Sequence, residues 1–132
     1  RTHLYIRNLR PDRWPAGDPT LYHSVGPFGD IDDGPTKQLL LSGRRELERY
    51  RRHAMDKRAA EELYAVVDDP GQLQNLAADP RHAATLQALR TRLDAWMRDT
   101  QDPRAMTDDD RFDRYPYYGP PVKVGKGVAP PR

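Results

Sequence analysis

Residues 61–80, with the sequence EELYAVVDDPGQLQNLAADP, decide the fold of this chain. The leucine, tyrosine and valines near the start of this stretch favour extended backbone, and they predict a β-strand over residues 62–67. The Asp-Pro-Gly sequence at residues 69–71 predicts a turn, because proline presets φ and glycine accepts φ > 0. One helical turn is expected over residues 72–76.

A helix is predicted to follow this stretch directly. Asp79 suits the N-cap, and Pro80 suits the first helical position, where no N–H is needed. An apolar stripe at helical spacing then continues to about residue 100. Its members are Leu86, Leu89, Leu93, Trp96 and Met97. Such a stripe is typical of packing against a core rather than of a cofactor pocket.

The region upstream predicts one more strand and a long loop. Residues 2–8, THLYIRN, alternate in the manner of a strand. Residues 9–35 are rich in proline, glycine and aspartate, and no regular element fits there. A loop of this length is unusual in a compact domain. Two interpretations have equal weight: a functional loop, or a surface loop held by Trp14, Tyr22 and Phe28.

Residues 36–52 predict a helix that Thr36 caps and that Ser42-Gly43 breaks or bends. Residues 44–58 carry seven Lys or Arg and three Asp or Glu. Because the two signs alternate, a solvated helix face is favoured over a nucleic-acid surface, and the second interpretation stays open. Residues 103–132 form a polar, proline-rich tail.

Composition limits the classes of function. The apolar fraction of 36% is too small for a large core in 132 residues. A net charge of +2 gives no strong attraction to nucleic acid or to a membrane, and the absence of cysteine excludes disulfide and thiolate chemistry. A two-stranded sheet is marginal in water. Since the chain also lacks an initiator methionine, we expect further strands upstream of it.

No catalytic or metal-binding residue is predicted from motifs. The four histidines do not have the spacing of metal ligands. The acidic clusters at residues 30–33 and 108–110 lack the spacing of a calcium loop, and solvated turn carboxylates are the favoured interpretation.

The order and spacing of short motifs across residues 1–119 resemble the C-terminal subdomain of type I sulfatases. The motifs are an ELY strand, a DP turn, NLA-x-DP, and a helix that ends in W and T-x-D. Matching positions are Glu62, Leu63, Tyr64, Asp69, Pro70, Asn75, Leu76, Ala77, Asp79, Pro80, Trp96, Thr100 and Asp102. The stretches RTHLYIRNLRPDRWPAGDP, GDIDDGPTK and RFDRYPYYG resemble a bacterial subgroup near the heparan N-sulfatases, or sulfamidases. Ala65 and Val66 depart from the pattern.

This resemblance implies an α+β fold of the alkaline-phosphatase-like type. A small antiparallel sheet would pack with a long C-terminal helix and would be incomplete without upstream strands. Residues 1–102 would form the subdomain, and residues 103–132 an extended tail. The partner would be the catalytic α/β domain of the same protein.

The resemblance also implies an activity for the longer protein, the hydrolysis of sulfate esters or sulfamates of carbohydrates such as glycosaminoglycans. Sulfatases use a formylglycine made from Cys or Ser, together with calcium. Because the formylglycine motif is absent here, both would lie upstream, and this chain alone would be inactive. A periplasmic or secreted location follows only from the family. Neither a nucleic acid nor a membrane is expected as a partner.

The C-terminal subdomain of such enzymes borders the substrate pocket. The substrate-binding candidates in this chain are Arg13, Trp14, Asp30, Asp32 and Lys37. Arginine and lysine can meet a sulfate or a carboxylate, and aspartate can accept hydrogen bonds from sugar hydroxyls. The alternative hypothesis is a stand-alone binding or scaffold module for acidic glycans or nucleic acid.

Overall fold

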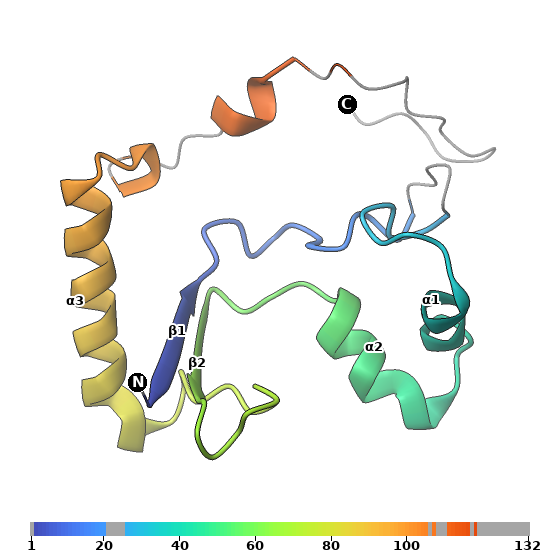
Figure 1. The fold of residues 1–132 in the computed structure, drawn as a ribbon, viewed down its shortest axis with the longest axis horizontal. Helices are drawn as coiled ribbons and strands as arrows, with labels where there is room; N and C mark the ends of the chain where they lie inside the picture. Colours follow the sequence, from blue (N-terminus) through green and yellow to red (C-terminus); the bar gives the residue numbers. More distant parts are fainter. Residues whose placement is uncertain (1, 21–25, 106, 108–110, 117, 119–132) are drawn as a thin grey trace. The chain divides into compact units, whose positions relative to one another are not determined.

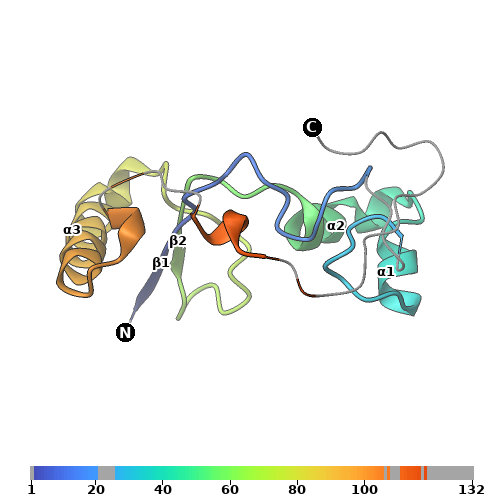
Figure 2. The same cartoon turned by 90° about the horizontal axis from the view of Figure 1, so that it is seen from above.

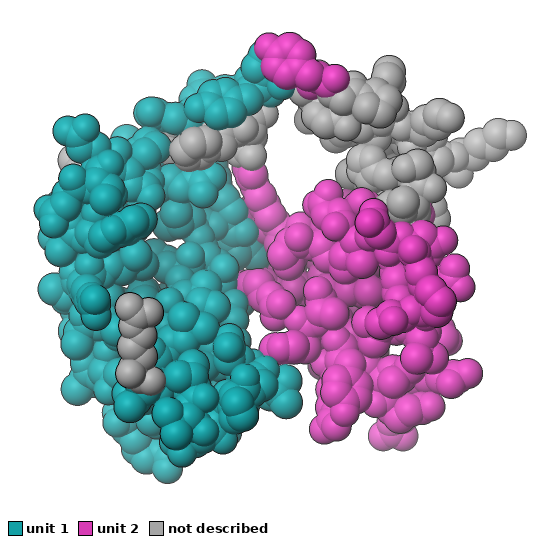
Figure 3. All heavy atoms as spheres, in the orientation of Figure 1, with its two compact units in different colours: residues 1–11, 59–116 teal, residues 12–58, 117–132 magenta. Residues whose placement is uncertain are grey.

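The computed structural model describes residues 2–20, 26–105, 107, 111–116 and 118. The chain divides into two compact units, which Figure 3 colours separately. Unit 1 comprises residues 1–11 and 59–116, and unit 2 comprises residues 12–58 and 117–132. Tyr22 and most of the predicted tail lie outside the described residues, and the predicted boundary at residue 102 stays a prediction.

Unit 1 contains a two-stranded antiparallel sheet, which confirms the α+β prediction. Strand β1 (His3–Arg7) pairs with β2 (Glu61–Ala65), and Tyr5 lies opposite Leu63 (Figure 1). Strand β2 ends two residues earlier than predicted. The N–H groups of the two aspartates at positions 68 and 69 both donate to the Ala65 carbonyl, which turns the chain out of the strand.

The edge of β2 that faces away from β1 is closed by residues 75–76. The Leu63 N–H donates to Asn75 Oδ1 at 2.9 Å, Asn75 Nδ2 donates to the Glu61 carbonyl at 3.0 Å, and the Leu76 N–H donates to the Leu63 carbonyl at 2.8 Å. The helical turn predicted over residues 72–76 is therefore wrong, because these backbone and side-chain groups bond to the strand instead.

The turn predicted at Asp69-Pro70-Gly71 is present, and the Gln72 N–H donates to the Asp69 carbonyl at 3.0 Å. The residue with positive φ is Gln72, at 52°, and not Gly71. Glycine therefore does not supply the left-handed conformation that the sequence predicted for it.

Helix α3 (Ala83–Asp99) packs against the sheet and lies next to β1 in Figures 1 and 2. A 3-10 turn, Pro80–His82, leads into it, and the Asp79 side chain accepts a hydrogen bond from the Arg81 N–H at 2.9 Å. The predicted start is thus confirmed. Of the predicted stripe, Leu86 and Met97 are buried, whereas Trp96 is 58% exposed and does not belong to the core of the described residues.

Unit 2 contains helix α1 (Pro35–Leu40), a 3-10 turn (Arg45–Leu47) and helix α2 (Glu48–Met55). The predicted break is confirmed, and Gly43 has φ of +75° there. The cap predicted at Thr36 is wrong. Gly34 occupies the N-cap without a side-chain hydrogen bond, and the helix instead begins with a proline, whose ring fixes φ.

The core of unit 2 gathers around three buried residues, Ala16, Phe28 and Met55. Partly buried apolar side chains pack against them, namely Trp14, Ile31, Leu40 and Leu41. The long loop is therefore packed against both helices of its unit, although no strand or helix forms within its described residues.

Candidate functional site

The loop that carries the predicted candidates is built from two segments that lie side by side. The Phe28 N–H donates to the Asp18 carbonyl at 3.3 Å, and the Asp30 N–H donates to the Ala16 carbonyl at 3.2 Å. Gly17 permits this close approach. It has φ of +85°, and a Cβ atom there would lie 2.8 Å from the backbone nitrogen of Gly29. Glycine is thus required where the two segments meet.

Lys37 lies inside this loop and is only 4% exposed. Its Nζ donates to the Phe28 carbonyl at 3.0 Å and to the Ile31 carbonyl at 2.8 Å. Phe28 has φ of 54°, so the turn that follows it is left-handed at this residue. A buried ammonium group satisfies carbonyl oxygens that would otherwise be costly to bury. Lys37 therefore stabilises the turn of residues 28–31.

The other predicted candidates lie at the surface of the same loop. Arg13, Asp30 and Asp32 are exposed. Trp14 is partly buried, with its ring edge-on to Phe28 at 6.0 Å between centroids. The structure brings Trp14 and Asp30 into neighbouring segments and directs the Lys37 ammonium inward. Substrate binding by these residues stays a prediction.

The sequence did not reveal a polar network between α3 and the sheet of unit 1. The Tyr5 hydroxyl donates to Glu61 Oε1 at 2.5 Å, and Arg90 donates to both carboxylate oxygens of Glu61. On the same face, Arg7 donates to Asp94 at 2.6 Å. Because Arg90 and Asp94 are four residues apart on one helix, they lie on neighbouring turns and can reach the sheet together.

This network shifts the ionisation of its members. The Arg90 hydrogen bonds lower the pKa of Glu61 to about 2, and the Tyr5 hydroxyl contributes in the same direction. Burial, followed by the hydrogen bond to Glu61, raises the pKa of Tyr5. The shifts favour charged Glu61 and neutral Tyr5, which is the arrangement that holds the helix to the sheet.

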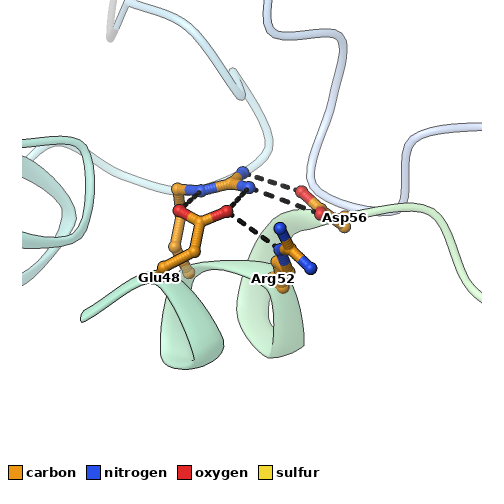
Figure 4. Close-up of polar contacts among 4 residues, drawn as sticks. Glu48, Arg52 and Asp56 are labelled. Carbon is orange, nitrogen blue, oxygen red and sulfur yellow. Dashed lines mark hydrogen bonds and ion pairs between the residues drawn. The ribbon is translucent and has the colours of Figure 1, made fainter. Parts of the chain in front are cut away.

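A second polar network lies along α2 and is shown in Figure 4. The Arg51 guanidinium donates to Glu48 at 3.0 and 3.1 Å, and to Asp56 at 2.7 and 3.4 Å. Glu48 also accepts from Arg52 Nε at 2.9 Å. The hydrogen bonds from Arg51, followed by those from Arg52, lower the pKa of Glu48 to about 2. Two of the three acidic residues in this basic region are therefore bound to arginines.

A hollow of about 550 Å³ opens at the C-terminal end of α3. It is lined by Met97, Arg98, Gln101, Asp102, Pro103, Thr107 and Arg111. None of the five predicted candidates lines it. Among the described residues, no group of three or more His, Cys, Asp or Glu side chains is placed to hold a metal ion, and no helix is long and apolar enough to cross a membrane.

Comparison with known proteins gives one partial similarity. The chain is 46% identical over 52 residues to N-sulphoglucosamine sulphohydrolase from Homo sapiens. The match covers 39% of this chain and 10% of the human protein. No model of a protein family matches the chain, and no solved structure matches it. The similarity supports a relationship to sulfatases, and the chain corresponds to a small part of that relative.

Proposed function

We propose that this chain is the C-terminal part of a sulfatase that hydrolyses sulfate esters or sulfamates of carbohydrates. The observation that carries the proposal is the 46% identity over 52 residues to N-sulphoglucosamine sulphohydrolase. In this proposal the chain completes the fold of the longer protein and borders its substrate pocket. The longer protein is periplasmic or secreted, and its catalytic α/β domain is the partner of this chain.

The hydrolysis of the sulfate group is assigned to the rest of that protein. The chain has no cysteine and no formylglycine motif. The described residues also offer no cluster of carboxylates that fits the calcium ion of a sulfatase. In this proposal calcium and formylglycine are held outside this chain, and its residues take no catalytic step.

The free edge of β1 supports the fold-completing role. Leu63 directs its N–H and carbonyl toward residues 75–76, away from β1. Backbone groups alternate in direction along an antiparallel pair, so the opposite residue, Tyr5, also directs its N–H and carbonyl away from its partner strand. His3 and Arg7 share this direction, and within the described residues no hydrogen bond uses their outward groups. A further strand of the longer protein would pair there.

The test is to express the longest reading frame that contains this chain, and to measure sulfate release from N-sulfated and O-sulfated glucosamine. The 132-residue chain alone serves as the matched control. The proposal expects release by the longer protein, its loss with a calcium chelator, and none from the control. A reading frame without a formylglycine motif and without sulfate release would contradict it.

A further inference from the structure

The surface at the N-terminal end of α2 carries positive charge that the acidic residues of the region do not neutralise. Arg44, Arg45 and Arg49 are exposed, and among the described residues none of them has an acidic partner. Arg45 lies in the 3-10 turn that leads into α2, and Arg49 lies in the first turn of α2. These three arginines are called the basic surface below.

Two of the three acidic residues in this region are paired with arginines outside this surface. As Figure 4 shows, Glu48 and Asp56 converge on the guanidinium group of Arg51, whose side chain is 24% exposed. Glu48 also binds Arg52. The remaining acid of the region, Glu46, is exposed, and it is outnumbered three to one by the basic surface.

The contacts of two aromatic side chains in unit 2 bear on which class of polyanion can bind the basic surface. The Arg49 guanidinium lies 4.5 Å from the centroid of the Tyr50 ring and donates to its hydroxyl. Lys57 Nζ lies 5.1 Å from the centroid of the Trp14 ring. Single-stranded nucleic acids bind by stacking bases on open aromatic rings. Here each of the two rings already carries a cation, so at most one face of each ring is available to stack a base.

Arginine is well suited to the binding of oxyanions. Its guanidinium is planar, weakly hydrated and presents five N–H donors, so it binds oxyanions in a bidentate manner. Contact with the Tyr50 ring restrains Arg49, and one hydrogen bond to that hydroxyl leaves most of its donors available. Arg45 and Arg49 come from different elements, the 3-10 turn and α2, so the two side chains can meet different anionic groups of one chain.

We propose that the basic surface binds the sulfate and carboxylate groups of an acidic glycan. The choice of glycan as the polyanion rests on the proposed function, and binding would add contacts to the substrate chain away from the reacting bond. From the sequence alone, a solvated helix face was the favoured interpretation of residues 44–58. The structure adds that two of the three acids, Glu48 and Asp56, bind Arg51, and that the aromatic rings carry cations.

The experiment measures binding of a heparin hexasaccharide to the 132-residue chain over a range of salt concentrations. The test variant is Arg45→Gln with Arg49→Gln, and the matched control is Arg92→Gln with Arg98→Gln on α3. All four side chains are exposed, and both variants lose two positive charges. We expect about tenfold weaker binding for the test variant, with a salt slope smaller by about two, and unchanged binding for the control.

A third variant probes the same surface in the opposite direction. Glu46→Gln removes the exposed acid, and binding should strengthen severalfold. Circular dichroism establishes that each variant is folded. Equal losses in the test and control variants would overturn the proposal, because net charge alone would then explain binding. No binding of the hexasaccharide by the wild-type chain would also overturn it.

A single-stranded oligonucleotide separates the two kinds of polyanion. If it binds more tightly than the hexasaccharide and loses affinity in the Arg45→Gln, Arg49→Gln variant, the surface is a nucleic-acid site and the glycan proposal is wrong. None of these measurements depends on sulfatase activity. Failure here is therefore distinguishable from failure of the proposed function.

Discussion

The two compact units are stabilised by different kinds of contact. In unit 1, ionised groups that are far apart in the sequence join the elements, as Glu61 does with Arg90 and Arg7 with Asp94. In unit 2, a small apolar core and one buried lysine hold a long loop, and Lys37 bonds to carbonyls six and nine residues away. Both units should therefore respond to changes of side-chain volume, unit 1 should respond to pH in addition, and unit 2 should respond to lost internal hydrogen bonds of Lys37.

The largest expected effects come from the two most deeply buried side chains, one in each unit. Met55 is 1% exposed and Leu63 is 0% exposed. Met55→Ala or Leu63→Ala should each lower the free energy of unfolding by about 2–5 kcal/mol, through lost burial and a residual cavity. Amide hydrogen exchange should show the loss first in the unit that carries the change. Leu73→Ala, at a position 67% exposed, is the control.

If both core variants accelerated amide exchange equally throughout the chain, the two units would unfold together. The two units would then not differ in how their stability responds to a core substitution.

Lys37→Met should have the next largest effect. It keeps the length of the side chain and removes the ammonium group that satisfies the Phe28 and Ile31 carbonyls. The Phe28 carbonyl keeps a hydrogen bond from the Ile31 N–H at 3.1 Å, whereas the Ile31 carbonyl loses its ammonium donor. Leaving a buried carbonyl unpaired costs about 1–3 kcal/mol. Exchange of the Asp30 and Ile31 amides should accelerate. Lys57→Met removes the same charge from an exposed position and should cost less; a cost as large as that of Lys37→Met would show that charge, not the internal hydrogen bonds, matters.

The effect of pH should fall on the Glu61 network. The pKa of Glu61 is about 2 in the folded chain, against an ordinary value of 4.5, because Arg90 and Tyr5 bond to the carboxylate. A lowered pKa contributes stability that is present above about pH 4.5 and is lost as the pH falls toward 2.

Glu61→Gln should therefore cost about 1 kcal/mol at pH 7, since the ion pair is partly exposed, and almost nothing near pH 2. Melting temperatures of wild type and variant between pH 2 and 7 measure this difference. A difference that stays constant across this range would mean that the charge of Glu61 does not hold α3 to the sheet.

The smallest effect is expected for Glu48→Gln on α2. Glu48 binds two arginines, but its side chain is 42% exposed and solvent screens the charges. The melting temperature should change less than it does for Glu61→Gln. A larger change would indicate that the ion pairs of unit 2 are as important as those of unit 1.

Local signals in the sequence predicted the regular elements well. The alternating residues of both strands, the Asp79-Pro80 start of α3 and the Ser42-Gly43 break each depend on neighbours in the chain. One error was local: α1 begins at Pro35, whose ring fixes φ, and Thr36 does not cap it. The other came from contacts with a distant strand, because Asn75 and Leu76 bond to β2 instead of forming a helical turn.

The candidate loop was predictable in extent but not in arrangement. Its length and its proline, glycine and aspartate content indicated a loop, and Trp14 and Phe28 do pack within it. The Lys37 ammonium group bonds to the carbonyl of Phe28, a residue of left-handed φ, and no residue type at that position signals this conformation. The same limit applies to the Glu61–Arg90 pair, whose partners are 29 residues apart.

The closure of β2 by Asn75 has a consequence for how the chain can vary. A side-chain amide there does what a peptide group does in a paired strand: its oxygen accepts from the Leu63 N–H, and from the Ala77 N–H as well, and its nitrogen donates to the Glu61 carbonyl. One side chain therefore supplies two of the three hydrogen bonds that close this edge. Asn75→Asp would keep the acceptor and lose the donor, so one change of base could open a second site for association between copies of the chain.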